Sequence, residues 1–172
     1  MRGILIGSAL VLAALPAWAQ TQQQIDLCYS PTATDDQTID GCTAMIQSGR
    51  YSGAELSHAF NNRAEGYIGK HEWDQVIQDD NQAIQVDPTN AQAYNNRGIA
   101  YKNKGLVDQA ISEYTQAIAL KPDYADAYYN RGLAYETKGQ RDQAISDYRA
   151  SLGFNPGDGD TLNAMKRLGV TP

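Results

Sequence analysis

The stretch AYNNRGIAYKNKGLVDQAISEYTQAIALKPDYADA, residues 93–127, decides the fold because the chain repeats it. It aligns without gaps on residues 127–161 and on residues 59–93, so the period is 34 residues in both directions. A fixed period of this length indicates a repeat protein in which every unit is one supersecondary motif. The sequence therefore predicts three units, at 57–90, 91–124 and 125–158.

Each unit has the pattern of two amphipathic helices joined by a turn. Apolar residues recur at intervals of three and four through both halves of the unit, as in a helix with one buried face. Gly105 and Gly139 stand at the predicted turn between the two helices. Two helices of this size cannot bury their apolar faces alone, so we expect the units to stack. A proline ends the second helix of each unit: Pro88, Pro122 and Pro156.

Large and small residues return at fixed positions of every unit. An aromatic residue near the start is followed four positions later by a small residue and three positions further on by tyrosine, as in Phe60–Ala64–Tyr67, Tyr94–Gly98–Tyr101 and Tyr128–Gly132–Tyr135. The second helix begins with a small residue in the later units, Ala110 and Ala144, and departs from this at Val76. In these positions the chain resembles the tetratricopeptide repeat family. The resemblance implies an all-α fold, a right-handed α-solenoid of helix-turn-helix units.

The segments on either side of the three units are expected to close the solenoid. Residues 37–48 align on residues 109–120, so 20–56 predicts a degenerate N-terminal helical hairpin, with a loop at 48–57 leading into the first unit. At the other end, residues 159–172 predict a capping helix with Asp160 as its N-cap and Gly169 as its stop. The inward-facing stripe of this helix would be Leu162, Met165 and Leu168.

Cys28 and Cys42, the two cysteines of the chain, are predicted on the first and second helices of this hairpin. Neighbouring antiparallel helices can bring the two sulfurs within reach, and we expect a disulfide that stabilises this weakest unit by about 2–4 kcal/mol. A redox-active pair would have the closer C-x-x-C spacing. Two cysteines and two histidines do not make a four-ligand site at a usual spacing, so no metal is expected.

Residues 1–19 have the composition of a signal peptide. Arg2 is followed by an uncharged apolar run at 4–15, by Pro16 and by the small–x–small pattern of residues 17–19. The apolar run is shorter than the roughly 20 residues that a spanning helix needs, which disfavours the alternative of a retained anchor. We therefore expect a periplasmic or secreted protein that is not held in the membrane after cleavage.

The charge balance argues against two classes of partner. Without Arg2 the chain keeps 13 of its 14 Lys and Arg residues against 20 Asp and Glu, a net charge near −7. An acidic excess of this size disfavours binding to nucleic-acid phosphates and to anionic lipid. No nucleic-acid partner is expected.

The sequence contains no recognisable catalytic motif. The patterns G-x-S-x-G, H-E-x-x-H, G-x-G-x-x-G and the phosphate-binding loop are absent. His58 and His71 have the positions of surface and turn residues. Many carboxylates recur where the second helix starts and where they favour its dipole: Asp74, Asp108 and Asp142. We therefore expect no enzyme activity and no cofactor.

The family resemblance implies where a partner would bind. In tetratricopeptide repeats the first helices of successive units line a concave groove that receives a peptide or helix of another protein. Asparagine amides there would hold an extended backbone, and apolar side chains would form a floor. The alternative is a merely soluble face on a scaffold that binds elsewhere. The candidate contacts at these positions are Asn61, Glu65, Asn95, Ile99, Lys102, Tyr129 and Leu133.

The same resemblance argues against one class of ligand. Units that clamp a C-terminal carboxylate have Lys and Asn at the fifth and ninth positions of the first unit, and Lys and Arg at the second and sixth positions of the third. This chain has Asn61, Glu65, Asp126 and Asn130 there. Because Glu65 and Asp126 would repel a carboxylate, we do not expect an acidic terminal motif as the ligand.

Two residues of the first unit depart from the repeat. His71 replaces the turn glycine, and Asp80 occupies the position held by Tyr114 and Tyr148 in the later units. A carboxylate in an aromatic position should be exposed or paired, because burying it alone is costly. Asp80 therefore predicts either a looser second helix or a contact with the N-terminal hairpin or a partner.

Three arginines return at the repeat period and could form a ladder that grips an anionic ligand. Each has an acidic residue sixteen positions later, however, and a ligand-binding ladder would gain nothing from that match. The offset predicts ion pairs between the two helices of each unit. The pairs are Arg63 with Asp79, Arg97 with Glu113 and Arg131 with Asp147.

The leading hypothesis is an exported scaffold or adaptor that binds a peptide or helix of another protein in its concave groove. The alternative is a structural component that assembles with copies of itself into a homo-oligomer. An enzyme is the third and weakest hypothesis.

Overall fold

A computed structural model describes residues 17–171, so the predicted signal peptide at 1–19 lies almost wholly outside the described residues. Within residues 17–171 the chain forms nine α-helices and one 3-10 helix, η1 (Leu27–Tyr29), and contains no strand. The α-helices are α1 (Ala17–Asp26), α2 (Asp35–Gln47), α3 (Gly53–Gly69), α4 (Trp73–Val86), α5 (Ala91–Asn103), α6 (Val107–Leu120), α7 (Ala125–Thr137), α8 (Arg141–Phe154) and α9 (Gly159–Arg167).

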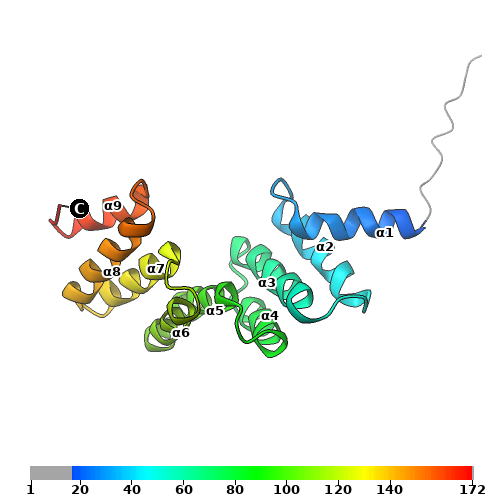
Figure 1. Cartoon of the computed structure of the whole chain (residues 1–172), viewed down its shortest axis with the longest axis horizontal. Coiled ribbons are helices and arrows are strands. Elements are labelled where there is room, and N and C mark those ends of the chain that lie inside the picture. Colours follow the sequence, from blue (N-terminus) through cyan, green and yellow to red (C-terminus); the bar gives the residue numbers. More distant parts are fainter. Residues whose placement is uncertain (1–16, 172) are drawn as a thin grey trace, which may run out of the picture.

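The helices follow one another around an arc (Figure 1). Helices α3 and α4, α5 and α6, and α7 and α8 pack as pairs, and each pair packs on the next. Helices α3, α5 and α7 also contact one another in series and lie on the inner side of the arc, whereas α4, α6 and α8 lie on its outer side. The predicted α-solenoid of helix-turn-helix units is confirmed.

The turns inside the units use a left-handed backbone residue. Gly105 and Gly139 have φ values of 78° and 72° after α5 and α7. His71 takes the same position after α3 with φ 60°, although a side chain makes this conformation unfavourable. The turn after α3 therefore keeps the backbone conformation of the other two turns, although histidine replaces glycine.

The later two units share one packing device. Tyr114 and Tyr148, on the outer helices α6 and α8, are fully buried. A Cβ atom added to Gly98 or Gly132 would lie 2.6 Å from Cε1 of the tyrosine ring, which is too close for any real contact. The ring thus packs directly on the backbone of the inner helix, and this is why the repeat has glycine there.

The predicted pairs of arginine and carboxylate are confirmed in all three units. In each, Nε and Nη2 of an arginine on the inner helix donate to a carboxylate on the outer helix, at N···O distances of 2.7–3.1 Å. The third nitrogen, Nη1, donates to the outer helix before it, at Thr43, Asn81 or Thr115. Each arginine therefore joins three helices and belongs to the framework.

The N-terminal hairpin is closed by a disulfide between Cys28 and Cys42. Cys42 lies on α2 as predicted, but Cys28 does not lie on the first helix, because α1 ends at Asp26 and the chain tightens into η1. Gly41 allows the two parts to approach, since a Cβ there would lie 2.6 Å from the carbonyl oxygen of Gln24. Helix α3 already begins at Gly53, so the second half of the loop predicted at 48–57 is helical.

Helix α9 caps the other end of the arc, with one correction to the prediction. Its N-cap is Asp158, not Asp160, because Asp158 Oδ2 accepts a hydrogen bond of 2.9 Å from the backbone N–H of Thr161. Met165 is fully buried on the inward side. Gly169, with φ 68°, follows the end of the helix as predicted.

Candidate binding surface

The seven predicted contact residues all lie on the inner helices α3, α5 and α7, but the structure does not expose them equally (Figure 1). Asn61 and Asn95 are 1% and 4% exposed, so little of either amide is open to a partner. Glu65 is exposed. The remaining four are half-buried: Ile99, Lys102, Tyr129 and Leu133. A binding role for any of the seven stays a prediction.

The buried asparagines belong to contacts between units. Asn130 Nδ2 donates to Asn95 Oδ1 across the interface between α7 and α5, at 3.0 Å. The equivalent atoms one unit earlier, Asn96 Nδ2 and Asn61 Oδ1, are buried and have no hydrogen-bond partner among the described residues. Asn62 Nδ2 donates to the carbonyl oxygen of Cys28 in the hairpin, at 2.9 Å. Asparagine stands at the sixth position of every unit, and this recurrence is the sequence signal for these contacts.

Asp80 is fully buried beside Asn61. Its Oδ1 accepts a hydrogen bond of 3.1 Å from Asn61 Nδ2, while Oδ2 has no partner among the described residues. Burial raises the pKa of Asp80 well above its ordinary value, and the hydrogen bond from Asn61 opposes this shift. The expectation that Asp80 is exposed or paired is met only in part, because it is fully buried with one carboxylate oxygen hydrogen-bonded and the other without a partner among the described residues. Its hydrogen bond lies within the first unit and does not reach the N-terminal hairpin.

The C-terminal part of the inner surface joins aromatic and charged groups. Burial alone would raise the pKa of Glu136, but hydrogen bonds from Arg167 and Tyr148 outweigh it, and the net shift is downward. Arg167 Nη2 lies 2.6 Å from Glu136 Oε2, so this carboxylate is neutralised within the protein. The rings of Tyr129 and Tyr148 lie 5.9 Å apart in a tilted arrangement. Because Tyr148 is fully buried, this part of the surface presents the ring of Tyr129, and the charge of Glu136 is already paired.

The middle of the inner surface is different, because Lys102 holds the position that Glu136 has one unit later. Lys102 is half-buried, and desolvation lowers its pKa. The hydroxyl of Tyr114, which corresponds to that of Tyr148, is buried without a hydrogen-bond partner among residues 17–171.

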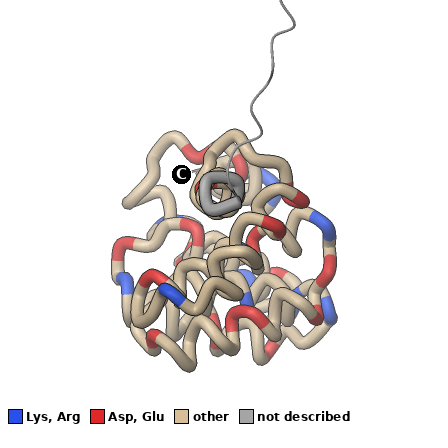
Figure 2. Tube along the Cα trace, turned by 90° about the vertical axis from the view of Figure 1, so that its right-hand side faces the viewer, with Lys and Arg blue, Asp and Glu red and all other residues tan. Residues whose placement is uncertain are grey.

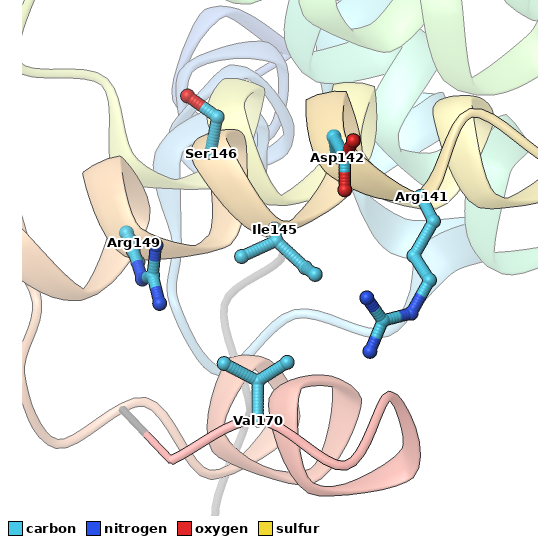
Figure 3. A pocket seen from close by; sticks show the side chains of 6 residues that line it. All are labelled: Arg141, Asp142, Ile145, Ser146, Arg149 and Val170. Atoms are coloured by element: carbon cyan, nitrogen blue, oxygen red, sulfur yellow. The ribbon is translucent and has the colours of Figure 1, made fainter.

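Two of the pockets lie at opposite ends of the solenoid, one on the outer helix α8 and one beside the inner helix α3. The larger, of about 510 Å³, lies between α8 and the segment after α9 and is lined by side chains that include Arg141, Ile145 and Val170 (Figure 3). Arg141 Nη2 donates to the carbonyl oxygen of Leu168 at 2.6 Å and so holds this segment to α8. The other pocket, of about 230 Å³, lies between the N-terminal hairpin and α3 and includes Glu65.

Acidic and basic residues are interspersed along the described chain (Figure 2). Within residues 17–171, no three His, Cys, Asp or Glu side chains are grouped so that they could hold a metal ion. None of the helices described is both long enough and apolar enough to cross a membrane.

Solved structures of other proteins have the same fold. The Arabidopsis OM64 TPR domain is 26% identical, with a TM-score of 0.64 over 67% of this chain and 95% of that one. The crystal structure of MamA is 25% identical, with a TM-score of 0.66 over 79% of this chain and 78% of that one. The first TPR of Spaghetti (RPAP3), bound to the HSP90 peptide SRMEEVD, is 23% identical, with a TM-score of 0.65 over 70% of this chain and 96% of that one.

Comparison of the sequence with curated proteins gave no match. Family models do match it. The model described as TPR repeat matches residues 72–105 and 104–139, and the model described as tetratricopeptide repeat matches residues 125–158. Together these segments cover half of the chain, and they coincide with the helices α4 to α8 of the solenoid. The chain belongs to the tetratricopeptide repeat family.

Proposed function

We propose that the protein is an exported adaptor that holds a segment of a partner protein against the inner helices α3, α5 and α7. One observation carries the proposal: apolar and aromatic side chains on the inner helices remain partly open to solvent, although the helices are tightly packed. They are Ile99, Tyr129 and Leu133. Partly open aromatic and aliphatic side chains on a rigid surface are typical anchor points for a partner.

Peptide binding by a structural neighbour supports the proposal. The first TPR of RPAP3 has the same fold and is bound to a peptide that ends in EEVD. The ligand we propose here is of another kind, because Glu65 and Asp126 are both exposed and would repel an acidic terminus. Glu136 does not add to this repulsion, because Arg167 neutralises its charge.

Export is part of this proposal and rests on two observations of different kinds. The composition of residues 1–19 is that of a signal peptide. Cys28 and Cys42 form a disulfide, a bond that persists in oxidising compartments such as the periplasm. A fusion of residues 1–30 to a reporter that is active only after export tests this step, and an inactive fusion contradicts it.

A double substitution on the inner surface tests the binding function. We expect Lys102→Ser with Tyr129→Ala to weaken binding of selected peptides at least tenfold, because it removes anchor area from the inner surface. The matched control is Ser112→Ala with Gln116→Ala, at two exposed positions of the outer helix α6. Equal binding by the two variants, with equal helicity by circular dichroism, contradicts the proposed groove.

Self-assembly is the second candidate function, and the C-terminal end of the arc favours it. The residues that line a pocket of about 360 Å³ beside α9 include Leu162 and Val170, an apolar surface that no further unit covers among the described residues. Sedimentation over a range of protein concentrations decides this point. A monomer at every concentration excludes it.

A further inference from the structure

The pocket between the N-terminal hairpin and α3 has walls from two different motifs. Tyr29 and Ser30 come from the end of η1 and the residue after it, and Thr38 comes from α2. Asn62 and Glu65 come from α3, the first inner helix. The pocket thus exists only because the disulfide-closed hairpin packs against the first repeat unit.

Hydrogen bonds hold both walls in place. Asn62 Nδ2 donates to the carbonyl oxygen of Cys28 at 2.9 Å and ties α3 to the disulfide-bonded turn. The hydroxyl of Tyr29 donates to the carbonyl oxygen of Glu55 at 3.4 Å, so the ring is tethered at its far end. A site with fixed walls needs little reorganisation when a ligand enters, and this favours affinity.

The chemistry of the pocket matches a positive charge. Among the described residues that line it, Glu65 is the one charged side chain and none is basic. The other walls present hydroxyl groups, from Ser30 and Thr38, and the ring of Tyr29, which is 51% exposed. A carboxylate that shares a pocket with hydroxyl groups and with no basic side chain is complementary to an ammonium or guanidinium group.

The carboxylate of Glu65 also lacks a cationic partner within the described residues, which a bound cation would supply. Glu65 is exposed as a residue, yet neighbouring groups desolvate its carboxylate enough to raise its pKa, and the nearby amide of Asn96 only partly opposes this. No salt bridge to Glu65 exists within the described residues. A positive group in the pocket would stabilise the ionised carboxylate.

We propose that this pocket receives a lysine or arginine side chain of the bound partner segment. The proposal rests on the proposed function, because the pocket adjoins the inner surface through Glu65. It would bind one side chain of a partner segment that lies on the inner surface. The charged end of that side chain would pair with Glu65. A divalent metal ion is a poor alternative, because a single carboxylate does not provide enough oxygen ligands.

A titration with small probes tests the pocket by itself. N-acetyl-lysine-methylamide and N-acetyl-arginine-methylamide are added to the isotope-labelled, oxidised protein, and amide shifts are followed by nuclear magnetic resonance. N-acetyl-norleucine-methylamide, which has the stem without the charge, is the matched probe. We expect the charged probes to shift the signals of Tyr29, Asn62 and Glu65 and the norleucine probe to do so at least fivefold more weakly.

Two variants separate the pocket from the general acidity of the protein. Glu65→Gln keeps the shape of the side chain and removes its charge, and we expect it to weaken binding of the charged probes about tenfold. Asp160→Asn removes one exposed charge from α9, at the opposite end of the array, and should leave their binding unchanged. An equal effect of both variants, or equal shifts with lysine and norleucine probes, overturns the proposal.

Selection of displayed random peptides on the immobilised protein tells this proposal apart from the proposed function. We expect peptides rich in lysine and arginine from the unchanged protein, and loss of this enrichment with Glu65→Gln. Selected peptides without basic residues overturn the cation pocket and leave the groove intact. If no peptide is selected, the proposed binding function is contradicted. The cation pocket is then tested by the small-probe titration alone.

Discussion

At the scale of single residues, Asp80 shows how one substitution in a repeat is accommodated. In the later units a tyrosine ring at this position packs on glycine, but the first unit has Ala64 in the glycine position. A ring would meet the Cβ of Ala64, whereas the short side chain of Asp80 leaves space for it. The two departures therefore compensate in shape. They leave a buried carboxyl group whose single hydrogen bond comes from Asn61.

Asp80 is predicted to make the protein less stable as the pH rises. Its pKa is raised in the folded state by burial, so the folded protein keeps a proton that the unfolded chain releases near pH 4. Between these two pKa values the folded state binds more protons, and the free energy of unfolding falls with increasing pH. The stabilisation that Asp80 contributes is fully present below its pKa in the unfolded chain. It is lost as the pH rises toward its pKa in the folded protein.

Asp80→Asn removes this penalty and is expected to raise the free energy of unfolding at pH 7 by about 1 kcal/mol or more. Asparagine keeps an oxygen that can accept the hydrogen bond from Asn61. Urea unfolding from pH 4 to pH 8 should show the gain over the unchanged protein growing with pH. Asp79→Asn is the control and should be destabilising, because it breaks the pair with Arg63. A variant less stable than the unchanged protein at pH 7 refutes this account of Asp80.

The arginine pairs were predictable from the sequence, and the burial of the asparagines was not. Arg97 and Glu113 keep the same offset as the other two pairs, and opposite charges at a fixed offset have a single structural explanation. Asn61 and Asn95 were assigned to the open face by counting positions from the start of each unit, as the family resemblance implies. Counting gives the direction of a side chain but not what the next unit places over it. That covering depends on how closely two units pack.

At the scale of helices and turns, positions that recur in every unit predicted the structure well. Segments that occur only once in the chain did not. The turn at Gly105 and Gly139 and its variant at His71 follow from alignment of the units. The start of α3 at Gly53 did not follow, because glycine and serine there have the composition of a loop. A helix that packs on a neighbouring hairpin can begin in such a sequence, since tertiary contacts outweigh local propensity.

Two glycines give opposite predictions for the same substitution. Gly105 has φ 78° and open space around its added Cβ, so Gly105→Ala costs only backbone strain. We expect a loss of about 1–2 kcal/mol. Gly153 lies in helix α8, also with open space, and Gly153→Ala should raise stability by about 0.5–1 kcal/mol. Urea unfolding of both variants measures the difference, and a loss of stability in both would mean that the effect is not conformational.

At the scale of the whole molecule, the arc is a one-dimensional array whose two ends are closed by different means. The disulfide between Cys28 and Cys42 constrains the hairpin at one end. Helix α9 covers the last unit at the other end, where Met165 is fully buried in a cluster with Ile145 and Tyr148. In such an array each unit contacts only its neighbours, so a change at one end should remain near that end.

Removal of residues 159–172 tests this view. The deletion uncovers Tyr148 and Ile145 and takes away the contact between Arg167 and Glu136, and we expect a loss of about 2–5 kcal/mol. Native-state hydrogen exchange should become faster in α7 and α8 and change little in α3. Reduction of the disulfide is the matched perturbation of the other end and should speed exchange in α1 and α2 only. If either change speeds exchange evenly over all helices, the solenoid unfolds as one cooperative body, and the inner surface then depends on both ends for its shape.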